Sequence, residues 1–151
     1  MSDQDSPQDI IIDSLQEIAR EVGEVPDISE IRNHFERFAK ILQQYLFPDA
    51  EVVFRPYVDN SVNRDATSWY ISVRFTSLKP DFLFEENICS IFIPINRYPV
   101  MINAAGSRYR IMNAAELETV TLDMIQSSSV KDTLKRYTRN ILMLAQFKPE
   151  G

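Results

Sequence analysis

The spacing of apolar residues changes from a helical to a strand-like period near residue 50, and this change constrains the fold more than any other feature. Before residue 50, apolar side chains recur every three or four positions, and after it they alternate with polar ones. Residues three or four apart share one face of a helix, whereas alternate residues share one face of a strand. A helix start at Asn113-Ala-Ala-Glu116 brings the helical period back. The chain is therefore expected to have an α+β fold.

Two helices are expected before residue 50. Ser6-Pro7-Gln8-Asp9 is typical of a helix start, because serine caps the first turn and proline fits the first helical position. The apolar stripe of this helix is Ile11, Leu15, Ile18 and Val22. A second helix opens at Asp27-Ile-Ser-Glu30, and its stripe is Ile31, Phe35, Phe38, Leu42 and Tyr45. The very short connection between the two favours an antiparallel helical hairpin.

Four or five antiparallel strands are expected next, at residues 51–58, 69–76, 88–95, 98–103 and 107–112. Residues 69–76 give the clearest pattern, with Trp69, Ile71, Val73 and Phe75 alternating with polar neighbours. Gly106 is expected in the left-handed conformation of a hairpin turn. The complete prediction is an N-terminal helical hairpin, a four- or five-stranded meander, and two C-terminal helices on one face of the sheet. Residues 1–5 are expected to form a disordered tail and residues 6–151 one domain.

The scarcity of histidine, cysteine and glycine removes many kinds of active site. The chain has one histidine, one cysteine and three separated glycines, which excludes zinc clusters, internal disulfides and phosphate-cradling glycine loops. His34 and Cys89 are expected to be structural residues rather than a catalytic pair. No catalytic residue, metal ligand or cofactor is predicted. A carboxylate-dependent metal hydrolase or nuclease, built on Asp81, Glu85 and Glu86, stays open as an alternative.

The composition favours a cytoplasmic protein. No apolar run approaches the roughly 20 residues that span a bilayer, so no membrane partner is expected. The first six residues are acidic and polar, unlike a secretory signal. A single cysteine fits a reducing compartment.

The charge is unevenly distributed along the chain. The net charge is −6, yet residues 97–151 hold eight basic and five acidic side chains. Nucleic-acid binding through a C-terminal basic face is an alternative function. Its residues are Arg108, Arg110, Lys131, Lys135 and Arg139.

The last helix supports the leading hypothesis, which is protein binding. Its final turns are apolar nearly all round, and apolar anchors rimmed by arginine and lysine are typical of protein interfaces. The residues predicted to bind a partner are Lys135, Arg136, Arg139, Leu142, Met143 and Phe147. The chain is therefore expected to be a non-enzymatic accessory or inhibitory subunit of a cytoplasmic complex. Its partner is another protein chain or a second copy of itself.

The order helix, antiparallel meander, Tyr98-Pro99 and helices is similar in outline to ubiquitin-conjugating-enzyme-like and RWD domains. Those families also carry a Tyr-Pro after a strand. The two N-terminal helices depart from that outline, and no cysteine follows Tyr98-Pro99 to serve as a conjugating nucleophile. The resemblance therefore implies a domain that binds without catalysing conjugation.

Overall fold

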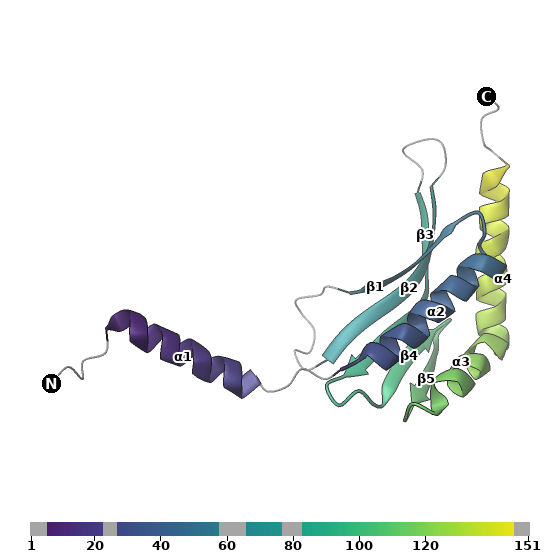
Figure 1. Ribbon diagram of the computed structural model, residues 1–151. Helices are drawn as coiled ribbons and strands as arrows, with labels where there is room; N and C mark the ends of the chain where they lie inside the picture. Colours follow the sequence, from purple (N-terminus) through teal and green to yellow (C-terminus); the bar gives the residue numbers. More distant parts are fainter. Residues whose placement is uncertain (1–5, 23–26, 58–65, 77–82, 147–151) are drawn as a thin grey trace.

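The computed structural model describes residues 6–22, 27–57, 66–76 and 83–146. The elements are helices α1 (Pro7–Val22) and α2 (Ser29–Tyr45), strands β1 (Glu51–Pro56), β2 (Ala66–Thr76), β3 (Leu83–Pro94), β4 (Val100–Ala104) and β5 (Ser107–Ile111), and helices α3 (Glu116–Gln126) and α4 (Ser128–Ala145). Figure 1 shows α2, α3 and α4 gathered at the sheet, whereas α1 stands apart. The tail expected at residues 1–5 lies outside the described residues.

The five strands form one sheet in the order β1-β2-β3-β4-β5, and each is antiparallel to the next. Ile71 lies opposite Cys89, and Ile91 lies opposite Ile102, so apolar side chains from three strands share one face. The buried core joins this face to residues of α2, α3 and α4. The predicted α+β fold class is confirmed, with the C-terminal helices on one face of the sheet.

Helix α2 lies on the sheet through the stripe that its spacing predicts. Ile31, Phe35, Phe38 and Leu42 are all buried, and the Phe35 ring lies 6.3 Å from the ring of Phe54 on β1. Tyr45 departs from the prediction, because it is 76% exposed at the end of the helix. Gln43 fixes the chain that follows: its amide donates to the Phe47 and Ala50 carbonyls, and its carbonyl accepts from Val52 N–H.

Helix α1 forms where the sequence predicts it, and Asp9 N–H donates to Ser6 Oγ at 3.2 Å, as the capping pattern requires. However, every side chain from Ser6 to Glu21 is exposed. Among the side chains that the structure describes, the expected packing of α1 against α2 is therefore not formed. The physical reason is that the sheet takes up the main apolar stripe of α2, and the exposed side of α2 offers only two large apolar side chains, Ile41 and Tyr45.

The long strand β3 extends beyond β4. It pairs with β4 only at Ser90–Phe92, whereas its pairing with β2 runs from Leu83 to Pro94. Helix α4 contacts β3 in the part that β4 does not reach: the Tyr137 hydroxyl donates to the Asn87 carbonyl at 3.0 Å, and its ring lies edge-on to Phe84. The last helix thus partners a strand edge as well as the core.

The hairpin between β4 and β5 confirms the predicted role of Gly106. Ala105 has φ +50° and Gly106 φ +79°, and the flanking residues Ala104 and Ser107 lie opposite each other. Two consecutive positive φ values match the two-residue turn that suits the twist of a hairpin. Strand β3 starts at Leu83, five residues before the predicted Ile88. Within the described ranges, no helix is long and apolar enough to cross a membrane.

Candidate functional site

Helix α4 exposes the surface that the sequence predicts for partner binding. Its inward stripe is Val130, Leu134, Tyr137 and Ile141. Leu142 and Met143, by contrast, are 54% and 55% exposed. Exposed cations on the same helix include Lys135, Arg136 and Arg139. Phe147, the sixth predicted residue, lies outside the described residues.

Part of this α4 surface forms a shallow cavity of about 290 Å³. Lys135, Arg139 and Leu142 line it from α4, and Leu46 closes it from the end of α2. Arg136 points to another side, because its guanidinium lies 5.5 Å from the centre of the Tyr137 ring. The structure thus brings three of the predicted residues together around an apolar hollow with a basic rim.

The stripe of α1 is a second exposed apolar surface, which the sequence reasoning assigned to a helix–helix contact instead. Ile11, Leu15 and Ile18 are 59%, 58% and 56% exposed. The opposite side of the helix is acidic, with four carboxylates and one arginine along its length. The sequence of α2 could have indicated that α1 stays unpaired. Helix α2 has one continuous apolar stripe, which can pack against a neighbouring helix or against the sheet but not against both.

The five cations of the nucleic-acid alternative lie on two different surfaces. Arg108 lies opposite Asn103 and Arg110 opposite Met101, on the sheet face away from the buried Ile102 and Ile111. Lys131, Lys135 and Arg139 lie on α4, in the helical layer that covers the other face. The sheet separates the two groups, so they do not form one basic face.

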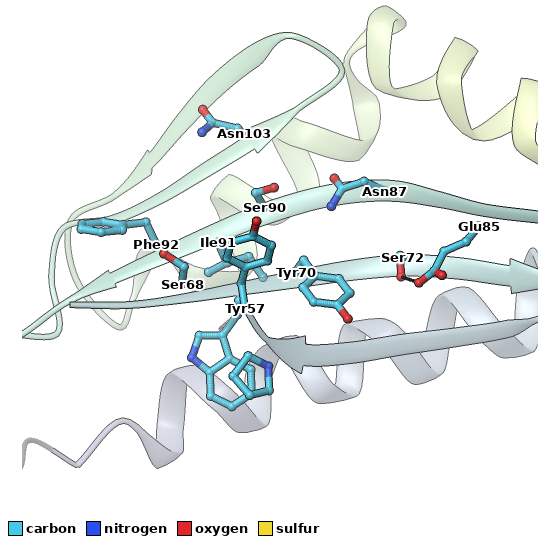
Figure 2. Close-up of a pocket in the computed structure, with 12 residues that line it drawn as sticks. Tyr57, Ser68, Tyr70, Ser72, Glu85, Asn87, Ser90, Ile91, Phe92 and Asn103 are labelled. Carbon is cyan, nitrogen blue, oxygen red and sulfur yellow. Dashed lines mark hydrogen bonds between the residues drawn. The ribbon is translucent and has the colours of Figure 1, made fainter. Parts of the chain in front are cut away.

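The uncovered face of the sheet holds a cavity of about 750 Å³. Figure 2 shows its lining, which includes Tyr57, Tyr70, Phe92, Asn87 and Asn103. The rings of Tyr57 and Tyr70 meet edge to face, with their centres 6.4 Å apart. The cavity is open and combines aromatic rings with amides and hydroxyls. The sequence predicted only that alternate residues of β2 face solvent.

Strand register arranges the charges around this cavity. Arg55 lies opposite Tyr70, which lies opposite Ser90; beyond Ser90 follow Asn103 and Arg108. An arginine therefore stands at each end of a row that crosses all five strands. Farther along β2 and β3, the Glu85 carboxylate lies 4.0 Å from the Arg74 guanidinium and accepts a hydrogen bond from Ser72 Oγ at 3.4 Å.

His34 has a structural setting. Its Nε2 lies 2.9 Å from Thr121 Oγ1, and the Thr121 hydroxyl donates to the Leu117 carbonyl at 2.7 Å. Because that hydroxyl proton is engaged, Nε2 is the donor in the first bond. Burial, and secondarily the positive charge of Arg37, lowers the pKa of His34. These two hydrogen bonds link α2 to α3, which agrees with the structural role predicted for His34.

Cys89 is fully buried among the core residues of the sheet, and burial raises the pKa of its thiol to about 12. A thiol with so little thiolate is a poor nucleophile, as a structural cysteine should be. Among the residues the structure describes, no group of three or more histidines, cysteines or carboxylates is placed to hold a metal ion. Glu85 is engaged by Arg74 and Ser72, and Asp81 lies outside the described ranges.

Comparison with known proteins adds no relative: no family model, no curated protein and no solved structure matches the chain. The class that the fold defines is therefore an α+β domain with a five-stranded antiparallel meander.

Proposed function

We propose that the protein is a non-enzymatic protein–protein interaction module that serves as an accessory or inhibitory subunit of a cytoplasmic complex. The observation that carries this proposal is the exposed stripe of α1, Ile11, Leu15 and Ile18. Apolar surface contributes about 25 cal/mol for each Å² removed from water. The stripe gains nothing from the domain to which it is attached, so it contributes only when another surface covers it.

The charges indicate which chemistry the partner surface has. Helix α1 carries four carboxylates and one arginine, mostly on the side opposite its stripe, so its net negative charge favours an apolar surface with a basic rim. The α4 surface has that character, with Leu142 among Lys135 and Arg139. A second copy of this chain therefore offers a matching surface, and α1 of one copy would lie on α4 of the other.

A pair of adjacent substitutions tests the role of the α1 stripe. Leu15→Glu and Gln16→Glu each add one negative charge, but Leu15 belongs to the stripe and Gln16 to the polar side. Sedimentation velocity from about 1 to 100 µM measures self-association by mass action. We expect the natural chain and Gln16→Glu to form dimers and Leu15→Glu to stay monomeric.

Mixing two variants tests whether α1 and α4 meet. Leu15→Glu keeps its α4 surface, and Arg139→Glu keeps its α1 stripe, so an equimolar mixture should associate although each variant alone does not. If the natural chain stays monomeric throughout, the partner is a different protein. In that case, proteins from the native host are captured with Leu15→Glu and with Gln16→Glu as baits, and the two sets show whether a partner depends on the α1 stripe. Equal capture of the same proteins by both baits would refute docking through α1.

A further inference from the structure

The cavity on the uncovered face of the sheet has a composition that a solvent-facing surface does not need. Its side chains alternate with those of the core, so the strand pattern alone would be satisfied by small polar residues. Instead, aromatic rings line the cavity, including those of Tyr57, Tyr70 and Phe92. Tyr57 leaves 56% of its surface in water, and Figure 2 shows its ring among the cavity residues. Tyr70 and Phe92 are partly buried, and the three rings together provide flat surfaces for stacking on one open face.

The charge of this face is opposite to the charge of the protein. The chain carries a net −6, whereas the open face holds Arg55, Arg74, Arg108 and Arg110 against Glu51 and Glu85. Arg74 and Glu85 lie close enough to offset each other. The remaining arginines stand on β1 and β5, at the two sides of the aromatic centre. An anionic ligand that crosses the strands would meet positive charge at both ends.

The dimensions fit a short linear polyanion. Neighbouring strands lie about 4.8 Å apart, so four gaps separate Arg55 on β1 from Arg108 on β5 by about 19 Å. Between them, Asn103 and Ser90 offer hydrogen-bond donors and acceptors beside the rings. Bases that are not paired can stack on aromatic side chains and expose their hydrogen-bonding edges, which bases inside a duplex cannot do.

We propose that the open face of the sheet binds a single strand of nucleic acid. Tyr57, Tyr70 and Phe92 stack with the bases, and Arg55, Arg108 and Arg110 contact the phosphates. This site differs from the basic face expected from the sequence, because it takes no residue from α4. It is also separate from the proposed protein-docking surfaces, since the α4 surface lies in the helical layer on the other side of the sheet.

Fluorescence anisotropy with the full chain tests the site. The probes are labelled oligothymidine and oligouridine of about 12 nucleotides, a length that one such platform accommodates. The expected result is binding at low salt that weakens as salt rises. The two probes distinguish DNA from RNA as the preferred strand. Tyr57→Ala should weaken binding between about 5-fold and 150-fold, the effect of losing one stacked base, and its exposure makes it a safe substitution for the fold.

Two double substitutions of equal charge separate this face from α4. Arg108→Ala with Arg110→Ala should flatten the slope of log affinity against log salt by about 1.4, the effect of two lost contacts to a single strand. Lys131→Ala with Lys135→Ala removes the same charge from α4 and should leave the slope unchanged. Equal effects of the two pairs would overturn the proposal.

Two further probes test whether the ligand is a single strand. A duplex of the same length should bind more weakly, because its bases are already stacked. Polyglutamate should also bind more weakly, because it carries charge without bases. Equal affinity for either probe, or no binding of the oligonucleotides at low salt, would overturn the assignment. Circular dichroism of each variant confirms that it is folded.

Discussion

Replacing two isoleucines by alanine, one in each N-terminal helix, tests whether α1 stands apart from the domain. Ile31 on α2 is 1% exposed, and Ile18 on α1 is 56% exposed. A buried Ile→Ala change costs about 2–5 kcal/mol, because it removes transfer free energy and leaves a cavity. At Ile18 little contact is lost, and alanine is the better helix former by about 0.5 kcal/mol. We expect Ile31→Ala to lower the free energy of unfolding strongly and Ile18→Ala to leave it within about 0.5 kcal/mol.

Urea denaturation followed by tryptophan fluorescence measures both variants. Trp69 is the only tryptophan of the chain, and its ring stacks on Phe54 at 4.8 Å, so it reports on the sheet. With a slope of about 2 kcal/mol per molar urea, a loss of 3 kcal/mol moves the midpoint by about 1.5 M. The measurement is made at two protein concentrations, because docking between copies would add stability only at the higher one. If Ile18→Ala lost more than about 1 kcal/mol at both concentrations, α1 would be packed within its own chain.

Three further outcomes concern residues of the core. The unfolded chain protonates His34 at its ordinary pKa near 6.5, whereas His34 in the folded chain has a lower pKa. Protonation therefore favours the unfolded state, and the free energy of unfolding should fall as pH drops from neutral to about 5.5. His34→Gln should reduce that loss in urea titrations at the two pH values. The Cys89 thiol, with a pKa of about 12, should resist a thiol reagent at mildly alkaline pH until urea unfolds the chain; rapid reaction of the folded protein would contradict its burial. Tyr137→Phe should cost about 0.5–1.5 kcal/mol by removing the hydrogen bond to Asn87, and an unchanged urea midpoint would show that the bond adds no stability.

The elements that the sequence predicts best are those whose local pattern and tertiary role agree. The alternation of Ile71 and Val73 with polar neighbours predicts a half-buried strand, and both side chains are fully buried. The stripe around Phe35 predicts the buried face of α2 in the same way. At Gly106 the turn requires a backbone conformation that favours glycine, so one residue identifies the hairpin. In each case the signal depends on neighbours in sequence alone.

The parts that the sequence does not predict depend on neighbours far along the chain. Ile11 and Leu15 have the spacing of a core-facing stripe, but spacing does not say whether a surface exists to cover them. The cavity on the open face depends on the register of β1 to β5, and that register shifts by an irregularity at Ile71/Ser72. The sequence therefore shows polar and aromatic residues at alternate positions of the strands. Only the pairing of the strands shows that their side chains gather into one cavity.

The contact of α4 with the free part of β3 has a consequence for the protein during its synthesis. Helix α4 follows all five described strands, so the sheet can pair before the helix has left the ribosome. In that interval, the Asn87 carbonyl and its neighbours on β3 present an open hydrogen-bonding edge beside apolar side chains, which favours pairing with other nascent chains. A chain truncated before α4 should therefore aggregate rather than remain partly folded. Helix α4 thus protects the strands made before it.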